Sequence, residues 1–258
     1  MARVIVVANQ KGGVGKTTTA VNLAASLAAA ECATLLIDFD PQANATSSFG
    51  YLPSDVRRDV YDVLSGEAGL DEVALATPLQ YLKLVPSSTA LVGAEVELAS
   101  HPERESQLAR RIAEVRDRYR IILIDAPPSL GILTLNGLVA ADSVLIPLQC
   151  EYLALEGVAK ILQSVDLVRK QMNPGLTLEG LLLTMFDARN KLSSQVAQEA
   201  RTHFPEQVFQ TVIPRNVRLS EAPSHGKPAL LYDINSRGAM SYLQLADELL
   251  KRIEHART

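Results

Sequence analysis

The sequence predicts an α/β fold, with a doubly wound, mostly parallel sheet flanked by helices. Runs of Val, Ile and Leu recur along the chain without polar alternation, which suits strands buried on both faces. Helical patterns separate these runs, and this alternation is typical of a parallel sheet with crossover helices. With 258 residues, 47% of them hydrophobic, the chain can bury one large core. We therefore expect residues 1–258 to form a single domain.

The expected elements alternate along most of the chain. The expected strands are residues 4–8, 35–38, 121–125, 144–148, 181–186 and 208–213. The expected helices are residues 17–30, 105–119, 157–172, 193–204 and 239–253. Residues 51–104 carry Pro and Gly turn signals without clear periodicity, and we interpret them as a less regular insertion on the same domain.

Composition argues against several classes of protein. Cys32 and Cys150 are far apart and form no CxxC pair, which argues against a disulfide framework and against a zinc or iron–sulfur site. No apolar stretch approaches the roughly 18 residues of a transmembrane helix, and the first residues lack signal-peptide features. We therefore expect a cytoplasmic protein without membrane insertion. The formal net charge of −4 argues against constitutive coating with nucleic acid.

A glycine-rich segment, KGGVGKTT at residues 11–18, follows the first expected strand and opens the first expected helix. This is the context of a P-loop, in which glycines bring backbone N–H groups close to an anion and the helix N-terminus adds its dipole. We expect Lys16 to reach the β- and γ-phosphates of a nucleotide and the Thr17 hydroxyl to ligate Mg²⁺. The residues expected around the phosphates are Lys11, Gly12, Gly13, Val14, Gly15, Lys16, Thr17 and Thr18.

The segment departs from the ordinary GxxxxGK[ST] pattern. Gln10 stands where that pattern has Gly, and a second lysine, Lys11, lies inside the loop. Taken alone, Lys11 could be a solvated surface residue. A cation this close to a triphosphate would otherwise point at its own nucleotide or at one across an interface.

Two apolar runs end in carboxylates, which predicts acidic groups beside the phosphates. Asp38 and Asp40 project to one side of an extended chain at the carboxyl end of a strand, where ligands of α/β sheets bind. One of these two carboxylates is expected to help hold Mg²⁺ or to orient the attacking water. Asp125 ends an IILID run, the Walker-B pattern, and is expected to contact Mg²⁺ directly or through water.

Four segments together resemble one family. KGGVGKT at 11–17, DFDPQANAT at 38–46, DAPPSLG at 125–131 and IPRNVRLSEAPSHGKP at 213–228 are similar to those of the ParA/Soj chromosome- and plasmid-partition ATPases. These belong to the deviant Walker-A group of P-loop NTPases, with MinD and the nitrogenase iron protein. The resemblance implies Mg²⁺-dependent hydrolysis of ATP to ADP and a homodimer when ATP is bound. It also implies non-specific binding to nucleoid DNA and a ParB-like partner that stimulates hydrolysis.

The resemblance also implies roles for single residues. Lys11 corresponds to the signature lysine that reaches the partner subunit's nucleotide, and Gly12 to the glycine that permits close approach of two subunits. Asp40 corresponds to the aspartate that activates water, and Asp125 to the Walker-B residue. With Thr17 and Asp38, Asp125 completes the expected metal site.

Further roles fall in the C-terminal part of the chain. Pro214 and Asn216 resemble adenine-side contacts, and Arg189 and Arg218 fall where the family places DNA-binding arginines. Residues 187–252 contain nine basic and seven acidic residues, so their composition alone does not distinguish a DNA-binding patch from a mixed solvated surface.

The alternative interpretation is a MinD-like, membrane-associated ATPase that positions the cell-division machinery. It requires a C-terminal amphipathic helix with basic and bulky apolar residues. Residues 242–253 supply leucines, but Asp247 and Glu248 lie among them, which favours a helix packed on its own domain. A nitrogenase-like redox role lacks its paired cysteines, and a related kinase would need an acceptor site that we do not find.

Overall fold

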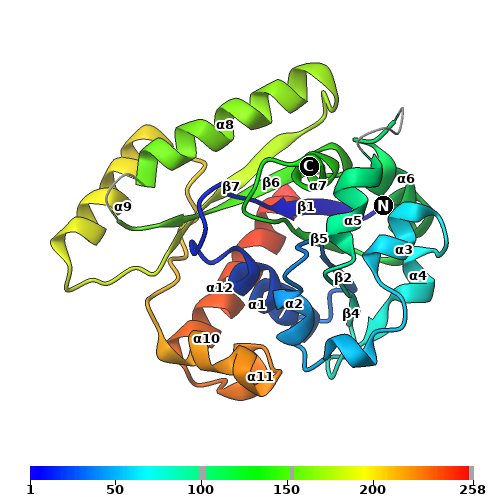
Figure 1. Cartoon of the computed structure of the whole chain (residues 1–258). Helices are drawn as coiled ribbons and strands as arrows, with labels where there is room; N and C mark the ends of the chain where they lie inside the picture. The colour runs from blue at the N-terminus through cyan, green and yellow to red at the C-terminus, as the bar shows by residue number, and fades with distance from the viewer. Residues whose placement is uncertain (99–102, 152–153, 256–258) are drawn as a thin grey trace.

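The strands form one twisted sheet whose edges lie far apart in the sequence. The computed structural model describes residues 1–98, 103–151 and 154–255. Among them, seven strands pair in the order β3-β4-β2-β5-β1-β6-β7, and every pair is parallel except β3 with β4. The strands are β1 (Arg3–Val7), β2 (Thr34–Asp38), β3 (Leu75–Ala76), β4 (Leu82–Val85), β5 (Ile121–Asp125), β6 (Ser143–Gln149) and β7 (Thr177–Thr184). The predicted doubly wound α/β fold is confirmed (Figure 1).

Helices cover both faces of the sheet. The α-helices are α1 (Lys16–Ala29), α2 (Asn44–Ser47), α3 (Val60–Ser65), α4 (Leu70–Val73), α5 (Leu91–Leu98), α6 (Gln107–Val115), α7 (Ile132–Ala140), α8 (Ala154–Gln171), α9 (Lys191–His203), α10 (Val217–Glu221), α11 (Ala229–Tyr232) and α12 (Arg237–His255). Short 3₁₀ turns are η1 (Pro53–Asp55), η2 (Arg116–Arg118) and η3 (Ala222–His225). The five expected helices correspond to α1, α6, α8, α9 and α12, with shifted ends. Helix α7 escaped the sequence analysis because its ILTLNGLVA segment has no charged face to set a helical period.

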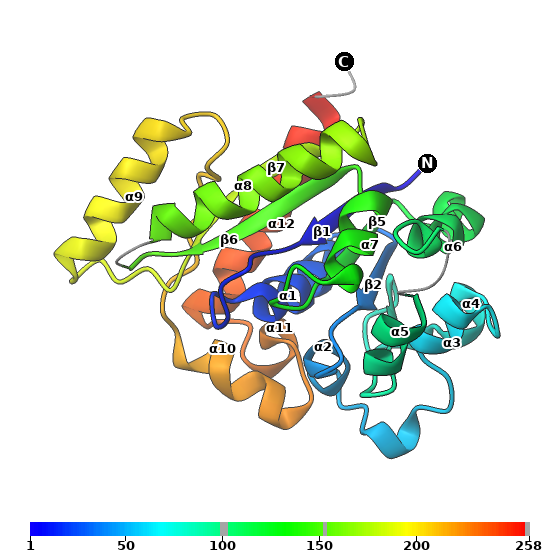
Figure 2. The ribbon, with the colours of Figure 1, turned by 45° about the horizontal axis from the view of Figure 1, so that its top comes forward.

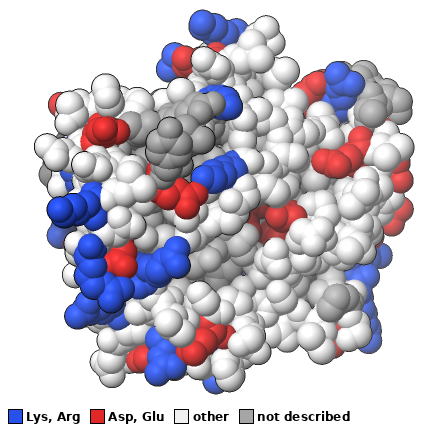
Figure 3. Space-filling model, turned by 60° about the vertical axis from the view of Figure 1, so that its left-hand side comes forward, with Lys and Arg blue, Asp and Glu red and all other residues white. Residues whose placement is uncertain are grey.

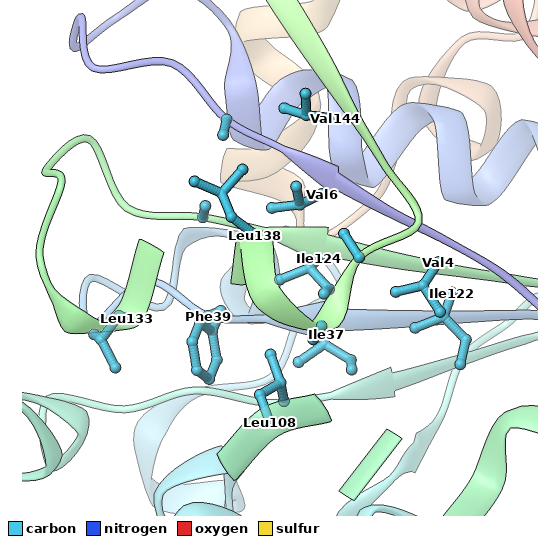
Figure 4. Close-up of a cluster of buried hydrophobic side chains, with 14 of the residues drawn as sticks. Val4, Val6, Ile37, Phe39, Leu108, Ile122, Ile124, Leu133, Leu138 and Val144 are labelled. Atoms are coloured by element: carbon cyan, nitrogen blue, oxygen red, sulfur yellow. The ribbon is translucent and has the colours of Figure 1, made fainter. Parts of the chain in front are cut away.

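Alternate residues of each central strand enter two separate cores. Val4 and Val6 belong to the core under α3 to α8, whereas Ile5 and Val7 belong to the core under α1 and α12. Figures 1 and 2 show α1 with α12 on one face of the sheet and α7 with α8 on the other. In Figure 4, Ile124 of β5 lies beside Leu138 of α7, and Ile37 of β2 lies near Leu108 of α6. Burial on both faces explains why these strands are uniformly apolar.

The expected strand at 208–213 is wrong as a strand. Its ends do run beside β7: the Phe209 amide donates to the Leu181 carbonyl at 2.9 Å, and the Ile213 amide to the Leu183 carbonyl at 2.8 Å. Between them, the amides of residues 210 and 211 donate to the carboxylate of Glu248 on α12, each at 2.8 Å. The ladder is interrupted because a side chain takes these donors.

The segment 51–104 supplies more regular structure than its sequence indicated. It holds β3, β4 and helices α3 to α5, and β4 pairs with β2 in the main sheet. Strand β4 has only four residues and includes the exposed Lys83, so its periodicity is too short to recognise. Within the described residues, no helix is both long enough and apolar enough to span a bilayer.

Candidate nucleotide-binding site

The predicted P-loop and acidic residues meet at the carboxyl edge of β1, β2 and β5. In the sheet, Asp125 at the end of β5 is paired in register with Asp38 of β2 on one side and with Val7 of β1 on the other. The loop that follows β1 passes over this edge and enters α1 at Lys16. The parallel register therefore places two carboxylates beneath the glycine-rich loop.

The backbone of the loop depends on two glycines. Gly13 has φ +75° and Gly15 has φ +90°, conformations that L side chains rarely adopt. Gly15 is the N-cap of α1 and provides no side-chain cap, so the amides of the first turn remain available to an anion. The Thr184 hydroxyl of β7 donates to the Val14 carbonyl at 2.9 Å and anchors the loop.

A cavity of about 330 Å³ opens above this loop. Its lining residues are Gly12, Gly13, Gly15, Lys16, Thr17, Thr18, Asp40, Gln42, Asn44, Pro128 and Met185. The structure thus brings most of the expected phosphate-side residues to one hollow. Val14 is buried under the loop, and Lys11 is absent from the cavity lining.

Asp38 is fully buried, and its hydrogen bonds are satisfied. Its Oδ2 accepts from the Thr46 amide and the Thr46 hydroxyl, both at 2.7 Å, and its Oδ1 accepts from the Asp40 amide at 3.3 Å. Burial raises the pKa of Asp38 to about 6, against the opposing effect of the hydrogen bonds from Thr46. These bonds hold the segment after β2 in place.

Asp125 is equally buried, but its hydrogen bonds are not satisfied. Neither carboxylate oxygen has a hydrogen-bond partner of good geometry among the described residues, although the Thr17 hydroxyl lies close enough to oppose the rise in its pKa. Burial, followed by the charge of Asp38, raises the pKa of Asp125 well above its ordinary range. An unpartnered buried carboxylate is costly unless it binds something.

Lys16 faces these acids from the start of α1. Its ammonium donates to the Lys11 carbonyl at 3.3 Å, and only 7% of the residue is exposed. Burial lowers the pKa of Lys16, and the charges of Asp125 and Asp40 oppose that shift. The site therefore holds one buried cation over three carboxylates.

This donor set fits Mg²⁺ with a nucleotide. Mg²⁺ binds oxygen ligands and in such sites uses one or two carboxylates together with substrate phosphates. The unpartnered oxygens of Asp125 and the nearby Thr17 hydroxyl are such ligands. Asp38 lies next to Asp125 in the sheet, but its Oδ2 already accepts from Thr46 and its Oδ1 from the Asp40 amide.

A second cavity of about 400 Å³ lies beside the loop, between α1, α10 and α12. Its lining residues are Gly15, Thr18, Thr184, Met185, Ile213, Pro214, Arg215, Asn216, Leu219, Ser220, Pro223 and Tyr242. Pro214 and Asn216 therefore share a cavity that borders the P-loop. The Asn216 side-chain oxygen caps α10 by accepting from the Arg218 amide at 3.0 Å, so this residue also has a structural role.

Among the residues that line these cavities, Thr184, Met185 and Tyr242 lie outside every motif that the sequence analysis identified. Met185 lines both cavities at φ +50°, a conformation that is uncommon for residues other than Gly and recurs at functional sites. Tyr242 is buried, and its hydroxyl lies 3.1 Å from that of Thr19 on α1. No local motif marks these residues.

The two expected DNA-binding arginines lie on neighbouring exposed segments. The Arg215 amide donates to the Phe186 carbonyl at 3.0 Å, which joins the segment before Arg189 to the segment before Arg218. Figure 3 shows Lys and Arg side chains gathered toward the lower left of one face. Exposed basic residues of these segments include Arg189, Lys191, Arg215 and Arg218.

Each of these two arginines pairs with acids of its own chain. Arg189 donates twice to Asp187, at 3.0 and 2.9 Å, and these bonds lower the pKa of Asp187 to about 2. Arg218 pairs with Glu221 at 2.7 Å and with Asp233 at 3.3 Å. Because these pairs are exposed, solvent screens them and they can exchange partners.

Comparison with known proteins places the chain in a family. A family model described as an AAA domain matches residues 2–178. The chain is 53% identical over 252 residues to the chromosome partitioning protein ParA of Myxococcus xanthus, covering 98% of this chain and 89% of that protein. It is 53% identical over 249 residues to the sporulation initiation inhibitor protein Soj of Bacillus subtilis, covering 96% and 98%.

A solved structure is similar over nearly the whole chain. Cobyrinic acid a,c-diamide synthase of Mycobacterium smegmatis, solved with a bound ATP analogue and magnesium, has a TM-score of 0.86 and 37% identity. The match covers 98% of this chain and 96% of that one. The fold, the P-loop and these identities lead to one conclusion: the chain belongs to the ParA/Soj family of chromosome-partitioning ATPases.

Proposed function

We propose that this protein is an ATP-dependent dimerising switch that drives chromosome or plasmid segregation. It binds and hydrolyses ATP with Mg²⁺, and as the ATP-bound dimer it binds DNA without sequence preference. The observation that carries this proposal is the unpartnered, fully buried carboxylate of Asp125 beneath a glycine-rich loop that opens a helix. Such a carboxylate is suited to a cation that arrives with its own phosphate ligands.

The phosphates are bound by backbone and by one ammonium. Gly12, Gly13 and the residues from Gly15 to Thr18 line the hollow at the N-terminus of α1, where loop amides can bind an anion, and Lys16 adds a buried positive charge. Thr17 and Asp125 would hold Mg²⁺, with Asp38 beside them, and the bound ion would neutralise charge that develops on the phosphates. Pro214 and Asn216 would contact the adenine from the neighbouring cavity.

Asp40 would act on the attacking water. It lines the phosphate-side cavity, and among the described residues only its Oδ1 accepts a hydrogen bond, from the Gln42 amide at 2.9 Å, so its other side-chain oxygen is uncommitted there. A carboxylate in this position can orient a water molecule and accept its proton.

Dimerisation would complete the site. Lys11 lies in the P-loop but outside the lining of its own cavity, and its side chain is 42% exposed in a pair with Glu151, where a nucleotide on a second copy could reach it. A Cβ built on Gly12 meets nothing within 4 Å in the part of the chain that the structure describes, which supports a role for this glycine in approach by another chain. The ATP-bound homodimer is therefore the proposed active form.

DNA binding would follow from dimerisation. Arg189 and Arg218 are exposed on adjoining segments, and a dimer doubles any patch that they form. Phosphate contacts of this kind read no sequence, which suits attachment to the nucleoid in the cytoplasm. A ParB-like partner would stimulate hydrolysis and so release the dimer from DNA.

The membrane alternative receives no support from α12. The apolar residues that an amphipathic anchor would need are packed against α1 and the sheet: Leu245 and Leu249 are fully buried and Ile253 is nearly so. Exposing the apolar face of α12 to a membrane would remove these side chains from the hydrophobic core. We therefore propose DNA, and not a membrane, as the surface on which the switch acts.

A co-sedimentation experiment tests the proposal. The protein is mixed with non-specific double-stranded DNA in the presence of ADP, ATP or AMPPNP, each with Mg²⁺, and with liposomes in parallel. The proposal expects retention on DNA with ATP and AMPPNP only. Equal retention with ADP, or sedimentation with liposomes in place of DNA, would contradict it.

A further inference from the structure

Lys11, the P-loop lysine that does not line its own cavity, has a partner within the same chain. The ammonium of Lys11 pairs with the Oε1 atom of Glu151, which lies between β6 and α8. The two residues are 140 positions apart in the sequence. Lys11 is the cation that the proposed function assigns to a second copy, so an internal partner for it affects dimerisation directly.

Glu151 is held in place to receive this lysine. Its other oxygen accepts from the Gln149 side chain at 2.7 Å, and its backbone amide donates to the Gln149 carbonyl at 2.9 Å. Its carbonyl accepts the Ala154 amide at 3.1 Å at the start of α8. A carboxylate fixed by its own backbone in this way loses little further freedom when it forms an ion pair.

The rest of the loop is tied to the same elements. The Asn9 side chain donates to the Pro147 carbonyl of β6 at 2.7 Å and accepts the Lys11 amide at 3.0 Å. The Gln10 side chain donates to Ser164 of α8 at 3.2 Å. Three consecutive residues before the glycines are thus attached to β6, to α8 and to the segment between them.

We propose that Glu151 is a positioning residue that holds Lys11 on its own subunit until a triphosphate on a second copy displaces it. The inference rests on the proposed ATP-dependent dimer. The two side chains are 42% and 40% exposed, so the pair is screened by solvent and can exchange. Glu151 therefore opposes dimerisation without preventing it, because phosphate oxygens of higher charge compete for the same ammonium.

Sedimentation velocity with AMPPNP and Mg²⁺ tests this role. Glu151→Gln keeps the size of the side chain but removes the charge, so the variant should dimerise at lower protein concentration than wild type. Because each dimer contains two such pairs, the dissociation constant of the dimer should fall by about two- to thirtyfold. Glu151→Asp retains the charge on a shorter side chain and should lie between the two. Asp166→Asn breaks another exposed ion pair, with Arg169 on α8, and should match wild type.

The outcomes separate the two proposals. If wild type dimerises with AMPPNP and Glu151→Gln shows no shift or dimerises less readily, the positioning role is wrong and the proposed function stands. If wild type stays monomeric with AMPPNP, the proposed dimer fails, and the role of Glu151 fails with it.

A second measurement uses the nucleotide-free protein and does not depend on dimerisation. It also tests the ion pair if one variant folds less stably than wild type. The urea midpoints of nucleotide-free wild type, Lys11→Met, Glu151→Gln and the double variant form a thermodynamic cycle. The proposal expects coupling, with the double variant less destabilised than the sum of the single variants. Additive effects would mean that the pair does not form in solution and would overturn the inference.

Discussion

The backbones of Gly50 and Gly226 are in direct contact. A Cβ built on Gly226 would lie 2.6 Å from the Gly50 Cα, and both residues have positive φ, +84° and +61°. Gly50 follows α2, whose Thr46 holds Asp38, and Gly226 lies between η3 and α11. The contact joins the segment that follows Asp38 to the part of the chain that carries Asn216 and Arg218.

Gly226→Ala should therefore lower the free energy of unfolding by about 2 to 4 kcal/mol, because the methyl group meets backbone and the left-handed conformation is strained. Urea denaturation measures the loss. Gly157→Ala is the matched control: it lies in α8, its Cβ meets nothing within 4 Å among the described residues, and it should be neutral or slightly stabilising. A similar loss in both variants would contradict the role of the contact.

Asp125→Asn should stabilise the nucleotide-free protein while weakening Mg²⁺-dependent nucleotide binding. The substitution removes a buried, unpartnered carboxylate, so the free energy of unfolding should rise by about 1 to 3 kcal/mol. At the same time the protein loses a metal ligand. Urea denaturation without nucleotide and titration with a fluorescent ATP analogue, with and without Mg²⁺, measure the two effects.

Asp38→Asn is the counterpart and should have the opposite effect on stability. Asp38 accepts hydrogen bonds at both oxygens, and an amide nitrogen cannot replace one of them. We expect a loss of about 1 to 3 kcal/mol. Equal shifts for Asp38→Asn and Asp125→Asn would show that the structural difference between the two carboxylates does not matter.

Asp40→Ala should separate nucleotide binding from hydrolysis. The loop and Lys16 remain, so ATP should still bind, but hydrolysis should fall by about 10² to 10⁴ because proton acceptance is lost. The variant should then persist on DNA as a dimer. Phosphate release and nucleotide binding, measured on the same preparation, check this, and turnover near the wild-type rate would remove Asp40 from the mechanism.

Replacing both Arg189 and Arg218 with Glu should abolish retention on DNA and leave nucleotide binding intact. Each substitution removes a phosphate contact and adds repulsion. Arg169→Glu is the control, because it also changes an exposed, ion-paired arginine but lies on α8. A gel shift with AMPPNP distinguishes them. Unchanged retention in the double variant would place the DNA-binding surface elsewhere.

Cys150 should make stability fall at alkaline pH. Burial raises the pKa of its thiol from 9.0 to about 11. The folded state therefore disfavours the thiolate, so this contribution to stability is complete below pH 9 and is lost as the pH rises through 11. The difference in urea midpoint between wild type and Cys150→Ala should shrink between pH 8 and pH 10.5. A constant difference would mean that the thiol does not titrate as a buried group.

Much of the site could be predicted from sequence because its chemistry is local. The glycines, Lys16 and Thr17 lie within one short segment. Asp38 and Asp125 each end a strand, and neighbouring parallel strands place their carboxyl ends at the same edge of the sheet. Thr184, Met185 and Tyr242 could not be predicted, because each reaches the cavities from an element that is distant in the sequence and no local motif marks it. The interrupted ladder at 208–213 was missed for the same reason, since Glu248 lies on a different helix.

The sequence by itself determined that this protein has a P-loop, acidic strand ends and the segments of its family, because those features depend on backbone freedom and strand periodicity within short windows. Only the tertiary structure decided how the charges are partnered. Asp38 is satisfied and Asp125 is not, because only one of them lies against Thr46. Lys11 pairs with Glu151 because β6 ends beside the P-loop. Such pairings depend on where distant elements meet, and no local pattern encodes them.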